Sequence, residues 1–504
     1  MPKKTTFVYF CIFIFLVVAS RFPSFSVLLD TDSSANAFFA RQMLRGEILY
    51  DKFHPAHHLP GIYYTFVLAF KLFGENPLAP RLLLLVFAIA NTWLIFLMAR
   101  AFYDARAGIL GAIFFILGSS QVWLSGTSAE MEHFANLFLT ATLFLFLVLL
   151  RQNKSAGQFI WVGVLGAICV LYKIILVAPL MTVGISLLIW MWLERDTPGS
   201  PQKGFLRLGA IVVGFIVPLV LVGGYFASLG LWQRLMLVFT FGFNYFNDSG
   251  LLSGGILFPL PFGFPLFMVA MNNIALLVFG LFGAYRLIRR AFPLCAMRNL
   301  TDLTLAFWLI SSFALAGLRG GGFAHYVLVV IPPLALMGGI EISLSYQRWQ
   351  VKSSKKQAFV GASVMAALII MNSLWMNYDL YLQYIPGKSA QISYENSYYQ
   401  HYQDSQKAII NYIKSHTKPD DFIYIWSTNL QEYYYADRLP PIDILWPEYV
   451  TATGLPERIF TPRTKYIVVD DIKKRPQWLL DGLDQSYYLE STIYGTEIYG
   501  RVQK

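Results

Sequence analysis

The chain has 504 residues, of which 56% are hydrophobic and 13% are charged. This balance is more apolar than that of soluble domains, so a soluble protein is excluded and a membrane protein is predicted. The formal net charge of +10 is carried largely by Lys and Arg in alternate connections between apolar segments. It is an orientation signal, and nucleic-acid binding is not needed to explain it.

Apolar segments that approach the roughly 20 residues of a bilayer crossing recur from Thr5 to Trp375. About eleven membrane-spanning helices are predicted, near residues 5–20, 82–99, 107–124, 133–150, 158–173, 175–193, 208–228, 258–285, 303–318, 325–345 and 358–375. Lys3 and Lys4 precede the first segment, as in a signal peptide, but no small-residue cleavage pattern follows it. We therefore interpret the first segment as a membrane helix.

The distribution of Lys and Arg predicts the orientation, because positive residues are retained on the cytoplasmic side. Basic residues gather at the N-terminus and in every second connection, including Arg100, Arg151 and Arg348. With an odd number of spans, the N-terminus lies in the cytoplasm and the tail lies outside the cytoplasmic membrane. The three cysteines, Cys11, Cys169 and Cys295, then offer no disulfide framework outside.

Two domains are predicted: a transmembrane domain over residues 1–375 and an extracytoplasmic α/β domain over residues 376–504. The tail elements expected are a helix from Asp404 or Ser405 to about His416, strands at Phe422–Trp426 and Lys465–Val469, and a hairpin around Glu490–Val502. The tail shows no nucleophile, phosphate-binding glycine loop or metal cluster. Acceptor recognition or structural cover is its expected role.

The first outer loop, residues 21–81, carries an acidic pair, Asp30 and Asp32, directly after the first apolar segment. Carboxylates beside membrane-embedded elements usually mark a substrate path or a catalytic site. Apolar residues at helical spacing over Asn36–Arg45 predict a short amphipathic helix with Asp32 at its N-terminal side. The helix dipole would keep this carboxylate charged, so Asp32 could act as a base.

Further along this loop, three histidines, His54, His57 and His58, precede a Pro-Gly turn and an apolar helix, Ile62–Phe73. Their spacing could supply metal ligands, but prolines interrupt the segment, so no metal site is predicted. Interfacial polar groups or donors to a phosphate are the favoured reading.

The stretch Leu49–Arg81, with L-Y-x-D, P-G-I-Y-Y and L-F-G-E-N before an Arg, resembles the polyprenyl-phosphate-sugar-dependent C-type (GT-C) membrane glycosyltransferases. These include protein O-mannosyltransferases and lipid A aminoarabinose transferases. The likeness covers about the N-terminal two thirds of the chain. It implies an α-helical polytopic fold and an enzyme that uses a lipid-phosphate-sugar donor.

The resemblance implies a catalytic Asp, often followed by Glu, in the first outer loop. Asp32 best matches this Asp, but the next residue is Ser33, and Asp30 could replace the missing acid. Family members often have Lys-Pro-Pro where this chain has His58-Leu59-Pro60, so His58 would replace a phosphate-binding Lys.

The second outer loop contains Glu130 and Glu132, and similar transferases carry an acid here. Glu132 and Asn136 are four residues apart, so one helix face can present both to a site. An equally good interpretation is that the acids lie in a solvated helix start, where the helix dipole favours them. Lys173 lies at a predicted outer span end, where the family has a Lys that can stabilise a departing phosphate. A snorkelling lysine is the alternative.

A glycine run, Gly320–Gly322, lies between Arg319 and the pair His325-Tyr326. Glycines let backbone approach a ligand closely, and Arg319 and His325 can donate to phosphate or sugar oxygens. An Arg followed by His-Tyr and a proline-containing helix also resembles this family.

The sequence therefore predicts an outward-facing inverting glycosyltransferase that moves a sugar from a polyprenyl-phosphate donor to a lipid, polysaccharide or protein acceptor. Asp32 would be the general base, and Lys173, Arg319 and His58 would hold the lipid phosphate. No cofactor is expected and no metal is implied, unless Asp30, Asp32 and Glu132 converge in space. A transporter or flippase, or a non-catalytic glycan-assembly partner, is the alternative.

Overall fold

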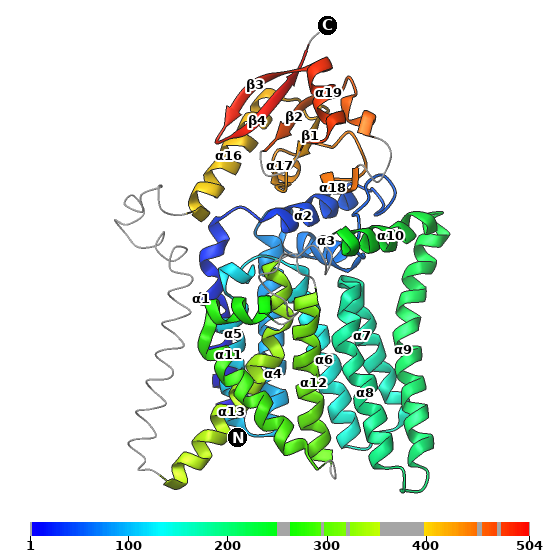
Figure 1. Cartoon of the computed structure of the whole chain (residues 1–504), viewed down its shortest axis with the longest axis vertical. Coiled ribbons are helices and arrows are strands. Elements are labelled where there is room, and N and C mark those ends of the chain that lie inside the picture. The colour runs from blue at the N-terminus through cyan, green and yellow to red at the C-terminus, as the bar shows by residue number, and fades with distance from the viewer. Residues whose placement is uncertain are drawn as a thin grey trace. The chain divides into compact units, whose positions relative to one another are not determined.

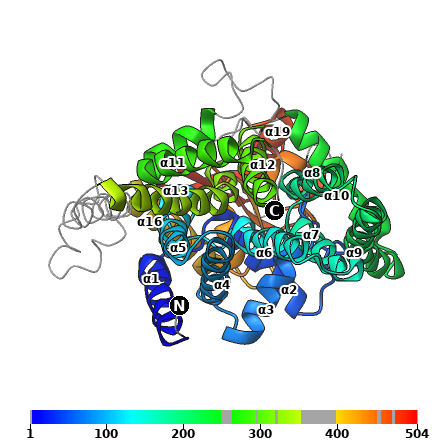
Figure 2. The ribbon, with the colours of Figure 1, turned by 90° about the horizontal axis from the view of Figure 1, so that it is seen from below.

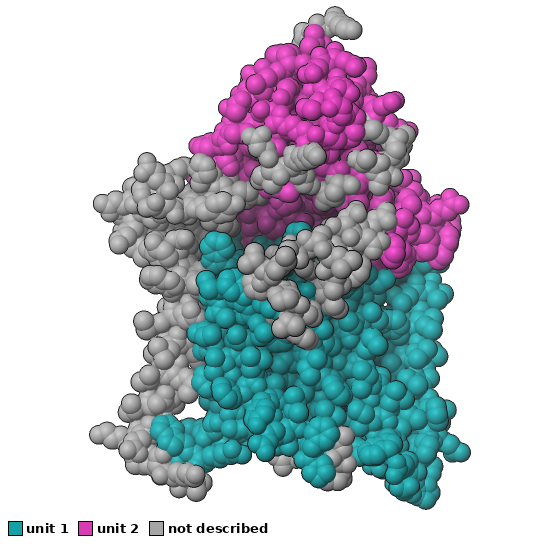
Figure 3. All heavy atoms as spheres, viewed as in Figure 1, with its two compact units in different colours: residues 1–25, 83–225, 245–381 teal, residues 26–82, 226–244, 382–504 magenta. Residues whose placement is uncertain are grey.

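The computed structural model describes residues 3–248, 263–293, 297–318, 323–352, 398–450, 456–470 and 475–502, and Figure 1 labels their α-helices and strands. The chain divides into two compact units, which Figure 3 colours separately. Unit 1 contains Met1–Phe25, Leu83–Tyr225 and Tyr245–Tyr381. Unit 2 contains Ser26–Leu82, Phe226–Asn244 and Leu382–Lys504. The first outer loop thus belongs to the same unit as the tail. The division into a transmembrane domain and a tail domain at residues 375/376 stays a prediction.

Unit 1 is helical throughout its described part. Its long helices are α1 (Lys3–Arg21), α4 (Ala79–Phe102), α5 (Ala105–Ser119), α6 (Met131–Arg151), α7 (Ile160–Tyr172), α8 (Val177–Leu193), α9 (Ser200–Ser228), α11 (Gly263–Ala291), α12 (Met297–Leu318) and α13 (Ile331–Lys352). Short 3₁₀ helices connect them: η1 (Phe22–Ser26), η2 (Val122–Leu124), η3 (Ala156–Phe159), η4 (Ile174–Leu176) and η5 (Ala324–Val329). In the part of the chain described, 7 helices are long and apolar enough to cross a membrane.

The predicted helical membrane architecture is confirmed, while the count of about eleven spans stays a prediction. α5 and the segment Ala156–Tyr172 are apolar but shorter than a full crossing. The predicted span at residues 358–375 lies outside the described residues.

Close backbone contacts hold the centre of unit 1 together, where α13 packs against both α5 and α11 (Figure 2). A Cβ atom on Gly339 of α13 would lie 2.4 Å from the backbone nitrogen of Gly111 in α5. A Cβ atom on Gly283 of α11 would lie 2.3 Å from the carbonyl oxygen of Met337. Lipid gives helices no hydrophobic reason to associate, so small residues and close van der Waals packing must supply the attraction.

Unit 2 combines helices with a small sheet. Its elements are α2 (Thr31–Leu44), α3 (Gly61–Phe73), α10 (Trp232–Asp248), α16 (Tyr398–His416), β1 (Phe422–Trp426), α17 (Gln431–Tyr435), α18 (Pro447–Val450), η7 (Pro456–Phe460), β2 (Thr464–Val469), α19 (Gln477–Ser486), β3 (Tyr487–Ile493) and β4 (Thr496–Arg501). The sheet order is β1-β2-β4-β3, with β1 parallel to β2 and the other pairs antiparallel. Tyr424, Trp426, Ile467 and Leu479 contribute to its buried core.

The expected α/β tail is confirmed, including the strand Phe422–Trp426, a second strand near Lys465–Val469 and the final hairpin. The predicted helix start at Asp404 or Ser405 is wrong, because α16 already begins at Tyr398. Asp404 is an interior residue whose carboxylate lies 4.0 Å from the Lys407 ammonium one turn later. An ion pair between residues three apart stabilises the interior of a helix. An aspartate can therefore occur inside a helix as well as at its N-cap, and Asp404 does not mark the helix start.

Candidate functional site

A buried ion pair forms the centre of a charged cluster in unit 1. Glu132 lies in the first turn of α6, and the Lys173 ammonium donates a hydrogen bond to its carboxylate. The side chain of Glu132 is 0% exposed and that of Lys173 is 9% exposed. Lys173 has extended backbone angles between α7 and η4, so the helix ends there and its side chain can turn to α6. A pair this buried is costly to desolvate and needs further polar partners.

η5 supplies two of those partners. The Lys173 ammonium lies 3.7 Å from the centre of the Tyr326 ring, a cation–π contact. The imidazole nitrogen Nε2 of His325 lies 3.9 Å from the same Glu132 oxygen that pairs with Lys173. Asn136 fixes η5 against α6, because its amide donates to the carbonyl of Leu328 over 2.9 Å.

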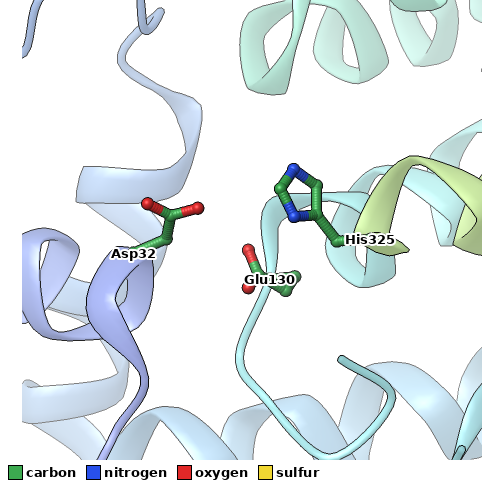
Figure 4. A group of neighbouring side chains, drawn as sticks. All are labelled: Asp32, Glu130 and His325. Carbon is green, nitrogen blue, oxygen red and sulfur yellow. The ribbon is translucent and has the colours of Figure 1, made fainter. Parts of the chain in front are cut away.

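Glu130 adds a second carboxylate to this cluster. It precedes α6 at the N-cap position, and one carboxylate oxygen lies within 4.8 Å of a ring nitrogen of His325. Figure 4 draws both side chains. The structure thus brings together five residues that the sequence identifies as candidates: Glu130, Glu132, Lys173, His325 and Tyr326. Their catalytic and binding roles stay predictions, and Arg319 lies outside the described residues.

Arg21 is a buried cation at the end of α1 that the sequence interpretation did not single out. Its guanidinium donates to both the carbonyl and the hydroxyl oxygen of Ser119, each over 2.9 Å. The sequence did contain a signal for this residue: Arg21 lies at the predicted outer end of a span, where the positive-inside trend disfavours an arginine.

Asp30 and Asp32 differ in their roles within unit 2. Asp30 is the N-cap of α2, and its Oδ1 accepts a 2.9 Å hydrogen bond from the backbone of Ser33. The helix therefore starts at Thr31, before the expected Asn36, because this cap satisfies an N–H group of the first turn. Asp32 projects from that first turn (Figure 4), where the helix dipole stabilises a carboxylate.

Two helices of the tail, α16 and α17, fix the backbone that leads into α2. The backbone N–H of Leu29 donates to the Tyr435 hydroxyl over 2.8 Å, and the Gln431 amide donates to the Leu29 carbonyl over 3.0 Å. One residue earlier, the N–H of Leu28 donates to Gln403 over 2.6 Å. The position of Asp32 therefore depends on residues about 400 positions later in the chain.

The histidines of the first loop each contact another protein group. His54 Nε2 donates to the carbonyl of Arg234 over 2.8 Å, and burial lowers the pKa of His54 to about 4, so this ring is neutral. His57 and His58 bond through Nδ1 to the hydroxyls of Tyr449 and Tyr63 at 2.7 and 3.2 Å. Within the described ranges these three histidines do not gather into a metal-ligand group. The phosphate role of His58 stays a prediction.

Comparisons with known proteins agree with this architecture. The dolichyl-phosphate-mannose-protein mannosyltransferase family matches residues 54–222. No curated protein matches the sequence.

The solved structures with a similar fold include ArnT from Cupriavidus metallidurans in the apo state, at 15% identity and a TM-score of 0.64, covering 99% of this chain and 98% of that one. The same enzyme bound to undecaprenyl phosphate matches at 13% identity and a TM-score of 0.59, covering 100% and 99%. The apo oligosaccharyltransferase of Archaeoglobus fulgidus matches at 15% identity and a TM-score of 0.55, covering 100% and 75%.

The chain is thus a multi-pass membrane protein with the fold of the GT-C glycosyltransferases, as the sequence predicts. Among the proteins compared, the likeness to ArnT extends over nearly the whole length of both chains.

Proposed function

We propose that the protein transfers a sugar from a polyprenyl-phosphate donor to an acceptor at the outer face of the cytoplasmic membrane, with inversion at the anomeric carbon. The observation that carries this proposal is the buried Lys173 ammonium, which lies against Glu132 and the Tyr326 ring. A desolvated cation at the end of a membrane helix is suited to a lipid phosphate. Support comes from the fold, which is shared with an ArnT structure that contains undecaprenyl phosphate.

The proposed chemistry divides between two groups of residues. Asp32 accepts the proton of the acceptor hydroxyl, whose oxygen then bonds to the anomeric carbon while the bond from that carbon to the phosphate oxygen breaks. Lys173 and His325 stabilise the charge on the departing lipid phosphate, and Arg319 and His58 are the further candidates. Asp32 lies six positions after Ser26, the last residue of η1, so the chain keeps this carboxylate within about 20 Å of that end.

The transfer assay follows sugar moved from radiolabelled polyprenyl-phosphate sugars in membranes with matched expression levels. Asp32→Asn is expected to lower turnover by about 10²- to 10⁴-fold, because general-base catalysis contributes on that scale. Asp30→Asn is the matched control: asparagine caps a helix as well as aspartate, so turnover stays near wild type. Unchanged turnover in Asp32→Asn would contradict its role as base, and no turnover of any donor by the wild type would favour a transporter or assembly partner.

Independence from divalent metal is a separate part of the proposal. The reaction as written needs none, because a phosphate is already a good leaving group and positioning with charge stabilisation can supply the rate. EDTA is expected to leave turnover unchanged. Loss of turnover that an added divalent cation restores would contradict this and would make Glu130 and His325 candidate ligands.

A further inference from the structure

An arginine-lined cavity lies in unit 1 at the C-terminal end of α11. Its volume is about 320 Å³, within the range of small-ligand pockets. The lining residues are Phe282, Tyr285, Arg286, Arg289, Arg290, Glu341 and Arg348. α11 is a candidate membrane span, so its end lies near the level of lipid headgroups.

The arginines of this cavity outnumber their acidic partners. Arg286 pairs with Glu341 at 2.7 Å, and Arg290 pairs with Asp302 at 3.3 Å. Arg289 and Arg348 have no acidic side chain within 4.0 Å among the residues described. The cavity therefore carries uncompensated positive charge.

Two of its donors are also buried without an acceptor. Nη1 of Arg286 and Nη2 of Arg290 find no hydrogen-bond partner in the described part of the chain. Buried donors of this kind are costly and are normally satisfied by protein, water or ligand. The helix dipole and the positive-inside trend account for arginines at this helix end. They do not account for a hollow with unsatisfied guanidinium nitrogens.

Aromatic side chains complete the pattern of a lipid site. Phe282 and Tyr285 line the cavity and are 61% and 59% exposed. Aromatic rings at the ends of spans lie at the membrane interface, where they contact the upper part of acyl chains. The charged part of the cavity is thus continuous with an apolar border.

We propose that this cavity binds the phosphate headgroup of an anionic membrane lipid. The four guanidiniums supply the charge-assisted hydrogen bonds that suit phosphate oxygens, and Phe282 and Tyr285 contact the acyl chains. Basic pockets between membrane helices bind anionic headgroups in the same way. This site is separate from the Glu132–Lys173 cluster, and the inference does not rest on the proposed transfer activity.

The test measures binding of phosphatidylglycerol to the full-length protein in phosphatidylcholine nanodiscs by native mass spectrometry. The double variant Arg289→Gln/Arg348→Gln is expected to bind about thirtyfold more weakly than wild type, since each basic group near the surface contributes about 1 kcal/mol. Arg289→Lys/Arg348→Lys keeps both charges and is expected to stay within a few-fold of wild type. Retained binding in the glutamine variant would overturn the proposal.

A matched control removes two exposed basic residues elsewhere, Arg195 and Lys203. Arg195→Gln/Lys203→Gln changes the net charge by the same amount. It is expected to leave lipid binding within about twofold of wild type, because salt screens exposed charges that lie outside the cavity. If Arg289→Gln/Arg348→Gln and Arg195→Gln/Lys203→Gln weakened lipid binding equally, the effect would come from general surface charge, and the proposed site would be overturned. Inorganic phosphate is the last arm: the lipid is expected to stay bound in millimolar phosphate, and its displacement would show that the cavity prefers the free anion, which would overturn the assignment to a lipid.

Discussion

Lys173 shows how a single residue can end a helix and supply a charge at the same point. It interrupts the apolar run between α7 and α8, and its side chain reaches Glu132 and the Tyr326 ring. A snorkelling lysine would place its ammonium in water, whereas this one is buried. The geometry therefore does not fit a snorkelling lysine, and the phosphate-binding role stays a proposal.

Paired substitutions separate a structural role of this ion pair from a role in transfer. Removing one partner by Glu132→Gln or Lys173→Met is expected to lower the free energy of unfolding by about 3–5 kcal/mol, because it leaves a buried charge unpaired. The double variant should regain most of this stability in thermal unfolding while transfer stays lost. A double variant with wild-type transfer would mean that the pair serves stability alone.

The buried carboxyl of Glu432 is expected to make stability depend on pH. Burial raises the pKa of this carboxyl from 4.5 to about 8, so the folded chain retains a proton that the unfolded chain releases between these values. Its stabilising contribution is complete below about pH 4.5 and is lost as the pH rises to about 8, by at most about 1.4 kcal/mol per pH unit. Thermal unfolding of the full chain from pH 5 to 8 should decline less steeply in Glu432→Gln.

The matched control for this pH series is Glu457→Gln, which changes an exposed carboxyl of η7. It should follow the wild-type slope. A Glu432→Gln slope equal to that of wild type would contradict the linkage.

At the scale of elements, α17 and α2 are coupled although they lie far apart in sequence. Tyr435 and Gln431 bond to the backbone of Leu29, three residues before Asp32. A small displacement of a reacting group can cost a large factor in rate, so the tail acts as a positioning element for the proposed base. This goes beyond the expected roles of acceptor recognition or cover.

Tyr435→Phe tests this positioning, because it leaves the buried N–H of Leu29 without its acceptor. The expected result is a kcat lowered by about tenfold or more with KM nearly unchanged, since binding surfaces are untouched. Tyr488→Phe is the control: its hydroxyl is exposed on β3 and contacts Glu490. Equal kcat values for the two variants would contradict the coupling.

The elements that could be predicted are those with a local signal. The strand Phe422–Trp426 and the helix α3, which begins at Gly61 directly after Pro60, follow from periodicity and turn residues. The starts of α2 and α16 could not be predicted, because an aspartate can cap a helix or form an ion pair inside one. Asp30 caps α2, whereas Asp404 pairs with Lys407 inside α16. The sequence identifies Lys173 as a candidate because it is a charged residue near a span end. Its contacts with Glu132 and Tyr326 could not be predicted, because they depend on packing between helices that are distant in sequence.

For the whole molecule, hydropathy and charge predicted a polytopic membrane protein but not its grouping into units. The first outer loop belongs to unit 2 with the tail, and composition alone suggested a boundary after residue 375. Contacts between distant parts of the chain determine that grouping, and the hydrogen bond from Leu28 to Gln403 is one of them. They leave no periodic signal in the sequence.

The predicted orientation can be measured with single cysteines in a chain whose own cysteines are replaced by serine. An impermeant maleimide should label Lys418→Cys of the tail in intact cells, because the tail is predicted to lie outside. Lys154→Cys, in a basic connection, should react only after permeabilisation. Both side chains are exposed, so accessibility reports the side of the membrane. The reverse pattern would contradict the predicted topology.

The glycine contacts of α5, α11 and α13 determine where this chain tolerates mutation. A random library selected for a folded protein would admit only glycine at Gly339 and Gly283, since any added carbon meets backbone atoms. Val220 and Leu221 of α9 are 63% and 67% exposed, and lipid would accept many apolar side chains there. At these two glycines the fold therefore depends on the absence of side-chain atoms, which hydropathy does not register.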